Sequence, residues 1–324
     1  MSRKVSIRKL AAELGLAPST VHRALSGHPN VSLKTRREVL RISQKKGYML
    51  PIHEKGNIAI IVPYFSFCPY LRSLLPYLES KFHDFGFRIM LILQQDVAML
   101  NDLMVDGIVS LVWEEGLEKQ LPRSFSIPII SINSPANTLE NIPRIISDPK
   151  GIRNALEYLR NRGCRKIFFI ISRTENVPDA AERLEEFRQF CAETGQDFDA
   201  LHLEAYGTHV IKENLPVILK AKPDACFCAS ETYTVNFAHM LKEAGKRIPE
   251  DISLMGLEDE RTTASFSPPI TAIRQDFEQL AELAAREMYA ACHDKIPPRG
   301  ATVPFRLIER ESVRQPGSRN KKHV

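Results

Sequence analysis

The 324-residue sequence has little that would suit a membrane or a secretory pathway. Its longest uninterrupted apolar runs, such as Ile58 to Val62, are the length of a strand and fall far short of the roughly 20 residues that cross a bilayer. The amino end, MSRKVSIRKL, is basic and has no apolar signal-peptide core. We therefore expect a cytoplasmic protein that makes no contact with a membrane.

Glycine is also sparse, and its distribution argues against several enzyme classes. The 15 glycines are scattered, and no Gly-x-Ser-x-Gly, Gly-x4-Gly-Lys-Ser/Thr or Gly-x-Gly-x-x-Gly occurs. Those spacings mark a hydrolase nucleophile, a phosphate-binding loop and a dinucleotide site. A hydrolase or sugar kinase is therefore the weaker alternative, although the acids Asp259 and Glu260 suit catalysis as well as a solvated turn. We expect no enzyme and no cofactor.

The six cysteines form neither a disulfide framework nor a zinc-ligand pattern. Cys226 and Cys228 would share one face of a strand, since side chains alternate along a strand. No second cysteine pair or histidine pair stands at zinc spacing. We expect buried free thiols and no metal.

The most informative stretch, Val5 to Tyr48, contains three short helical patterns in succession. Apolar residues recur at intervals of three and four from Ser6 to Leu14, and Gly15 suits the left-handed residue that ends a helix. A second helix is predicted from Pro18 to about Ser26. A third is predicted to open at Ser32, an N-cap candidate, and to stop at Gly47.

Spacing and charge together favour a helix-turn-helix over an ordinary solvated three-helix bundle. Ala11 lets two helices approach, Gly15 makes the turn, and Val21 locks the second helix on the first. Residues 1–48 contain eleven Lys or Arg and two acids, a net charge of +9, whereas the whole chain carries +5. Residues 49–324 therefore carry a net charge of −4. A basic module on a mildly acidic body is typical of a DNA-binding head.

A set of short matches through this segment identifies a family. It comprises Ile7-Arg8, Ala11-x3-Gly15, Ser19-Thr20-Val21-x-Arg23-x-Leu25, Asn30-Val31-Ser32, Thr35-Arg36 and Gly47-Tyr48. With these elements the segment resembles the DNA-binding head of the LacI/GalR family of bacterial transcription regulators.

The resemblance implies two kinds of DNA contact. Four residues of the second helix would read bases in the major groove: Pro18, Ser19, His22 and Arg23. Arg23 is the strongest candidate because a guanidinium can donate two hydrogen bonds to guanine. His22 replaces a residue that is usually Ser, and for it a phosphate contact or a solvent-exposed side chain is an equally good alternative to base reading. The phosphate contacts would come from Ser6, Thr20, Ser32, Thr35 and Arg36.

Residues 49–57, MLPIHEKGN, are predicted to be a short linker. Relatives usually have a longer connection with a hinge helix that wedges into the minor groove, and no such stretch is found here. Because wedging kinks DNA and adds contact surface, we expect less bending and lower affinity.

From Asn57 onward, apolar strand patterns alternate with helical ones. Such alternation predicts doubly wound parallel sheets, and its length suggests two lobes. The expected strands are 58–62, 87–93, 107–112, 127–132, 144–146, 166–171, 201–203, 225–229, 252–256 and 302–308. The expected helices are 70–85, 97–104, 148–162, 179–194, 209–219, 232–244 and 277–293.

This body also resembles the LacI/GalR family along nearly its full length. The matches are Ile58-x-x-Ile61-Val62-Pro63, Val105-Asp106-Gly107-Ile108, Ile127-Pro128-Ile129, Gly163-x-Arg165-Lys166-Ile167, Glu182-Arg183-Leu184-x-x-Phe187, Ile248-Pro249-x-Asp251-Ile252-Ser253, Pro269-Ile270-Thr271 and Arg310-Glu311-Ser312. The resemblance implies an α/β fold in which a three-helix helix-turn-helix head precedes a two-lobed, periplasmic-binding-protein-like body.

The expected domain plan follows from the pattern and the resemblance together. The parts are a DNA-binding head at 1–48, the linker at 49–57, an effector-binding and dimerisation body at 58–312, and a basic disordered tail at 313–324. The first lobe would comprise about 58–148 plus 277–308, and the second about 149–276.

The resemblance further implies a small-molecule effector, a sugar or sugar derivative, in a cleft between the lobes. Its contacts would be Ser66, Asn133, Arg183, Ser230, Glu258 and Phe277. Glu258 stands where an Asp is typical, and Ser230 where Asn or Asp is common. For Arg183 and Glu258 a surface ion pair or helix cap is the alternative, and Trp113 suits the cleft and the core equally.

The expected function is that of a homodimeric repressor on a pseudo-palindromic operator, with one half-site per subunit. The alternative is a regulator with a degenerate cleft that answers to a protein co-regulator or to no ligand. A tetramer is not expected, because the tail lacks a leucine heptad.

Overall fold

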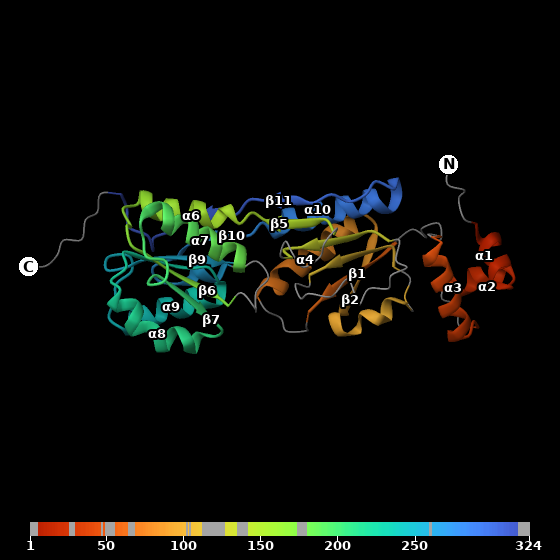
Figure 1. Ribbon diagram of the computed structural model, residues 1–324, viewed down its shortest axis with the longest axis horizontal. Coiled ribbons are helices and arrows are strands. Elements are labelled where there is room, and N and C mark those ends of the chain that lie inside the picture. Colours follow the sequence, from red (N-terminus) through yellow and green to blue (C-terminus); the bar gives the residue numbers. More distant parts are fainter. Residues whose placement is uncertain are drawn as a thin grey trace, which may run out of the picture. The chain divides into compact units, whose positions relative to one another are not determined.

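A computed structural model describes most of the chain as two compact units, and the first of them includes a three-helix head (Figure 1). The first unit comprises 1–66, 75–146 and 278–301, and the second comprises 67–74, 147–277 and 302–324. Ser66, Trp113 and most of the predicted linker lie outside the described residues. The residues that the structure describes are 6–25, 30–46, 48, 56–63, 69–101, 103, 105–111, 127–134, 142–173, 180–258 and 261–316.

The head contains the three predicted helices, α1 (Ile7–Leu14), α2 (Pro18–Leu25) and α3 (Leu33–Lys45). Ser6 Oγ accepts a hydrogen bond from Lys9 N at 3.4 Å and caps α1. Ser32 Oγ accepts one from Thr35 N at 3.1 Å, as expected of the N-cap of α3. Gly15 ends α1 at φ 64°, which confirms its predicted left-handed conformation. The helices enclose a core of their own: Leu10, Ala11, Val21, Ala24, Leu25, Val39 and Leu40.

The first unit is built on a six-stranded sheet in the order β11-β5-β4-β3-β1-β2. Its pairings from β5 to β2 are all parallel. Strand β1 is buried along nearly its whole length, as a parallel strand covered on both faces must be. The strands are β1 (Gly56–Val62), β2 (Phe87–Leu93), β3 (Gly107–Ser110), β4 (Ile129–Ile132), β5 (Arg144–Ser147) and β11 (Ala301–Val303). The helical segments are α4 (Pro69–Asp84), η1 (Gln94–Asn101), α10 (Phe277–Tyr289) and the π-helical turn η3 (Ala290–Asp294).

The second unit has a sheet in the order β12-β10-β9-β8-β6-β7, parallel except that β12 runs against β10. Helices α6 and α7 cover one face, and α8 and α9 cover the other (Figure 1). The strands are β6 (Ile167–Ser172), β7 (His202–Ala205), β8 (Ala225–Cys228), β9 (Ser253–Glu258), β10 (Thr271–Arg274) and β12 (Arg306–Ile308). The helical segments are α6 (Lys150–Asn161), α7 (Ala180–Thr194), α8 (Thr208–Lys220), α9 (Glu231–Glu243) and η2 (Arg261–Ser265).

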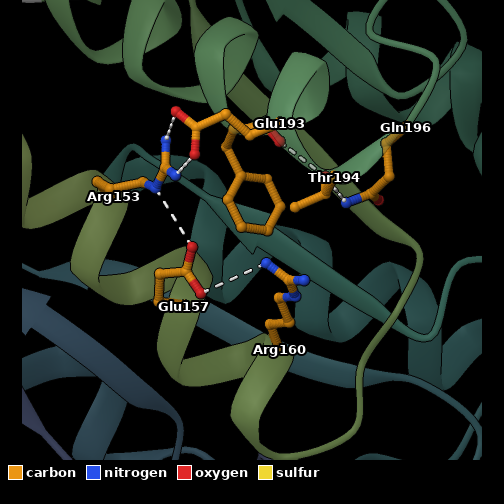
Figure 2. A network of polar contacts seen from close by, with 7 residues as sticks. Arg153, Glu157, Arg160, Glu193, Thr194 and Gln196 are labelled. Carbon is orange, nitrogen blue, oxygen red and sulfur yellow. Dashed lines mark hydrogen bonds and ion pairs between the residues drawn. The ribbon is translucent and has the colours of Figure 1, made fainter.

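Helices α6 and α7 are tied together by a polar network on the surface of the second unit (Figure 2). Arg153 donates from Nη1 to Glu193 Oε1 at 3.1 Å and from Nε to Glu157 Oε1 at 3.4 Å. Arg160 extends the network to Glu157. The hydrogen bond from Arg153 lowers the pKa of the Glu193 carboxyl. The pair therefore stabilises the fold above the carboxyl's ordinary titration range, and the contribution falls as the pH drops through that range.

The prediction of one continuous strand at 302–308 is wrong. The chain forms β11 and β12 instead, and these strands belong to different sheets. Pro304 lies between them and has no backbone N–H, so a continuous ladder is interrupted at that residue. The portion of the first unit that begins with α10 therefore ends at Ala301 and not at 308.

Two other expectations differ from the structure. The short helix expected at 97–104 is found as the 3-10 helix η1, which begins earlier, at Gln94, and ends at Asn101. The tail expected to be disordered from 313 is packed at its beginning. Val313 is buried, and Arg314 donates from its backbone to Ser253 Oγ at 3.2 Å and from Nη2 to Asp224 O at 2.9 Å. Residues 317–324 lie outside the described part.

Five of the six cysteines are described, and all five are buried free thiols, as predicted. Burial raises the pKa of Cys191 to about 11 and that of Cys292 to about 12, because a thiolate loses its hydration inside the protein. Burial also raises the pKa of Cys226 and Cys228 well above the ordinary value. No described helix is long and apolar enough to cross a membrane.

Since the thiolate is the reactive form, these buried thiols should resist alkylation in the folded protein. At pH 8, iodoacetamide should modify Cys164, Cys191, Cys226, Cys228 and Cys292 only after the chain is unfolded. Peptide mapping by mass spectrometry with and without denaturant measures this. Native labelling of Cys226 or Cys228 at the rate of the unfolded chain would contradict the packing of β8.

Candidate DNA interface and effector site

The head presents one face of α2 to solvent and buries the other. Val21, Ala24 and Leu25 are fully buried against the other two helices. The four residues predicted to read bases are all exposed: Pro18, Ser19, His22 and Arg23. Because α2 begins at Pro18, these residues occupy its first two turns, which is the part of a recognition helix that reaches base edges.

The residues predicted to contact phosphates lie at or near the starts of the three helices, and some of them also shape the head. Ser6 and Ser32 cap their helices, and Ser32 Oγ lies 2.8 Å from Thr35 Oγ1. Thr20 and Arg36 are half-buried. Phosphate contacts and helix capping are compatible for a serine hydroxyl, because it offers one donor and two acceptor positions.

The described effector-site candidates lie at or just beyond the carboxyl ends of parallel strands. Asn133 follows β4, Ser230 follows β8, and Glu258 is the last residue of β9. Phe277 opens α10 shortly after β10, and Arg183 lies in the first turn of α7. The carboxyl edge is where open α/β sheets bind ligands. Asn133 belongs to the first unit, and the other four belong to the second.

Arg183 and Ser230 are brought together by a hydrogen bond to the main chain. Arg183 is buried, and its Nη1 donates to Ala229 O at 3.3 Å, next to Ser230. Its guanidinium also lies 5.9 Å from the ring of Phe305. The Arg183 guanidinium is therefore buried and bonded to the main chain just beyond the end of β8.

Ser230 is positioned by a close contact between α9 and β9. It is the N-cap of α9, but its side chain makes no capping bond. Thr234 Oγ1 donates to Ser230 O at 2.9 Å and lies 3.5 Å from Leu257 O. The helix can approach this closely because Gly256 has no side chain, and a Cβ there would lie 2.3 Å from Thr234 Cγ2.

The end of β10 carries further polar groups that were not predicted. Gln275 is buried, and its Oε1 accepts a hydrogen bond from Ser147 Oγ at 2.9 Å. Asp276 is buried and pairs with Arg306. Phe277, also buried, meets Tyr70 edge to face at 5.7 Å between ring centroids. The predicted Phe277 therefore contributes an apolar face beside hydrogen-bonding groups.

Two other residues that the sequence patterns do not reveal lie at the ends of β6 and β7. The Arg173 guanidinium lies over the ring of Tyr206, 5.0 Å from its centroid. Arg173 N also donates to Ala205 O at 2.9 Å, which joins the two strand ends. Each residue directly follows its strand. That position was the one feature of the sequence that could have identified Arg173 and Tyr206 as candidate site residues.

Asn133 is buried with φ 52°, a left-handed conformation that asparagine tolerates better than most residues. Its backbone N–H donates to Ile145 O at 3.0 Å, which joins the ends of β4 and β5. Among the described residues, no cluster of three or more His, Cys, Asp or Glu could hold a metal.

Known proteins with the same organisation match this chain over nearly its whole length. A family model described as a periplasmic binding protein-like domain matches residues 156–313. The ribose operon repressor of Lactococcus lactis subsp. lactis (strain IL1403) is 22% identical over 96% of this chain and 98% of its own.

Solved structures share the fold. A complex of the transcriptional regulator CelR with cellobiose aligns over 95% of this chain and 99% of its own, with 22% identity and a TM-score of 0.71. A lac repressor dimer bound to operator and the anti-inducer ONPF aligns over 96% and 100%, with 17% identity and a TM-score of 0.70.

The head, the two parallel-sheet units and these relatives define a class, the transcription regulators with a helix-turn-helix head and a periplasmic-binding-protein-like body. Within that class the chain is similar to regulators of the LacI/GalR kind, among them the ribose operon repressor, catabolite control protein A and CelR, at 22%, 24% and 25% identity. The resemblance inferred from short sequence motifs is thereby confirmed.

The contact between β9 and α9 can be tested by two substitutions. Gly256→Ala should destabilise the protein by roughly 1–3 kcal/mol, since the added methyl overlaps the Thr234 side chain. Thr234→Ala removes both atoms nearest that methyl, so the double variant should be more stable than the sum of the single changes implies. Urea unfolding of the four proteins measures this, and strict additivity would contradict the contact.

Proposed function

We propose that this protein is a sequence-specific transcription repressor that acts in the cytoplasm as a homodimer on a pseudo-palindromic operator, and that it is not an enzyme. Helix α2 would read bases in the major groove. A small-molecule effector, a sugar or sugar derivative, would bind at the carboxyl ends of the parallel strands. Its affinity for the DNA-bound and DNA-free forms would differ, and that difference would change operator affinity.

The observation that carries the DNA half of the proposal is the exposed face of α2 on a basic head. Its outward residues include Arg23, which suits guanine, while the inward ones are fully buried. Residues 1–48 carry a net charge of +9, which favours approach to the phosphate backbone. The lac repressor dimer, which has the same fold, is known bound to operator.

Support for the effector half comes from the carboxyl edge of the second sheet. Arg183 and Gln275 supply donors and acceptors for hydroxyl groups, and Phe277 supplies an aromatic face. Glu258, the last residue of β9, would add a carboxylate. Such a mixture suits a carbohydrate, whose ring has polar edges and apolar faces. Among proteins with this fold, CelR is known in complex with cellobiose.

The proposal is tested by electrophoretic mobility shift on DNA from upstream of the protein's own gene, with and without a panel of sugars. We expect a salt-sensitive, sequence-specific shift that one sugar weakens or strengthens. Specific binding that no sugar changes would favour a regulator that answers to a protein partner or to no ligand. Absence of specific binding to that DNA and to other promoters would refute the DNA half.

Arg23→Ala should lower operator affinity by roughly 1–3 kcal/mol and relax base preference at the position that Arg23 reads. The physical reason is the loss of two hydrogen bonds to a base edge. The matched control is Arg41→Ala, which removes the same charge from an exposed position on α3. Titrations against operator and scrambled DNA measure both effects. Equal losses for the two variants would show that Arg23 contributes charge alone.

A further inference from the structure

The body begins, after the connection to the head, at a residue that is closely packed. Gly56 is the first residue of β1 and is buried. A Cβ at Gly56 would lie 3.0 Å from Asp106 Oδ2 and 3.0 Å from Phe87 Cδ1. Phe87 is also its partner in the register of β1 with β2. The first residue of the body therefore has little room to shift.

Asp106 ties the second residue of β1 to the start of β3. Asp106 Oδ2 accepts a hydrogen bond from Asn57 N at 2.7 Å, and Asp106 N donates to Asn57 O at 2.7 Å. This bridge lies just ahead of the β1–β3 ladder, which begins with Ile58 opposite Gly107. Loss of the carboxylate would remove the acceptor of the Asn57 N–H and loosen the beginning of β1.

The turn η3 holds Asp106 in turn. Cys292 Sγ donates to Asp106 O at 3.3 Å, and Lys295 Nζ donates to Cys292 O at 2.7 Å. Burial raises the pKa of the Asp106 carboxyl, while the hydrogen bond from Asn57 and the charges of His293 and Lys295 oppose that rise. Asp106 is thus fixed by η3 through its main chain and fixes β1 through its side chain.

The second unit repeats this arrangement and so provides an internal comparison. Asp224 directly precedes β8, as Asp106 directly precedes β3. Asp224 Oδ2 accepts a hydrogen bond from Lys166 N at 2.9 Å, and Asp224 N donates to Lys166 O at 2.8 Å. The two aspartates share a structural role but hold different strands. The strand held by Asp224 follows α6 of the same unit, whereas β1 follows the connection to the head.

The length of that connection makes its starting point important for DNA binding. The head is packed as far as Tyr48, whose N–H donates to Ser43 O at 2.9 Å. The seven residues from 49 to 55 span at most about 25 Å when fully extended. Release of Gly56 and Asn57 from β1 would add about 7 Å to this reach in each subunit. Because half-site centres lie about 34–36 Å apart or a multiple of it, that gain is a large fraction of the distance to be matched.

We infer that Asp106 is a positioning residue for operator recognition, because it fixes where the connection to the head begins and thereby restricts the half-site spacing that the dimer accepts. The inference rests on the proposed function, since it concerns how a dimer with two heads reads its operator. In this role Asp106 acts through the main chain of Asn57 and not through contact with DNA.

Operator duplexes with altered half-site spacing test this in the full-length protein. The operator is the sequence that the wild type selects from random duplex DNA, and its spacing is changed by one, two or three base pairs. By mobility shift, the wild type should lose roughly tenfold or more in affinity for a two-base-pair change, because its heads can no longer reach both half-sites together. Asp106→Ala should lose no more than about threefold, and its affinity for a single half-site should equal that of the wild type.

Two matched variants separate positioning from general stability. Asp106→Asn should keep the wild-type spacing preference, because the amide oxygen can still accept from Asn57 N. Asp224→Ala removes the corresponding bond from the second unit and should also keep it. Hydrogen exchange measured by mass spectrometry should show roughly tenfold faster exchange at Asn57 in Asp106→Ala than in Asp224→Ala.

A further variant tests the length of the connection without touching Asp106. Insertion of two glycines between Lys55 and Gly56 lengthens the chain by about 7 Å and leaves the bridge to Asn57 in place. This variant should reproduce the broadened spacing profile of Asp106→Ala, and it does so whether or not Asp106→Ala folds well enough to be measured. A spacing preference as sharp as that of the wild type would overturn the inference.

The other outcomes are equally decisive. A sharp spacing preference or unchanged exchange at Asn57 in Asp106→Ala would overturn the role of Asp106 and leave the proposed repressor standing. Equal broadening in Asp224→Ala would also overturn it, since destabilisation of the body would then account for the effect. Failure of the wild type to select any sequence would overturn the DNA half of the proposed function and the inference with it.

Discussion

Burial of both faces of the parallel strands is the constraint on which the body of this protein depends. Strands β1 and β6 lie inside their sheets, and their side chains are buried on both faces. Such a strand cannot carry a polar residue without an internal partner. Polar and charged side chains therefore collect where the strands end. The polar residues proposed to bind an effector accordingly lie at the carboxyl ends of the parallel strands.

Packing below the sheet edge also fixes the residues that are candidates for the effector site. Gly256 is buried within β9, and its lack of a side chain lets Thr234 of α9 lie against the strand. The same contact holds Ser230 at the end of β8. Arg183 likewise bonds to the main chain at Ala229 while it presents charge at the edge. The positions of these residues at the carboxyl edge of the second sheet are thus set by packing one layer below it.

Much of the fold could be predicted because its patterns are local. Apolar runs such as Ile58 to Val62 identify buried parallel strands, and caps such as Ser32 and turns such as Gly15 identify the head. The split at Pro304 was missed because sheet membership depends on distant pairing, although the proline marked the break. Arg173 and Tyr206 were missed because single exposed residues form no pattern, and only strand register brings them together.

The measurement that tests the central claim most directly is selection of binding sites from random duplex DNA by the full-length protein. The account predicts enrichment of two similar half-sites in inverted orientation, with centres separated by about one helical turn or a multiple of it, because a two-fold dimer presents two recognition helices. Enrichment of no sequence would contradict it. A single unrepeated motif would contradict the dimeric arrangement and leave only a DNA-binding head.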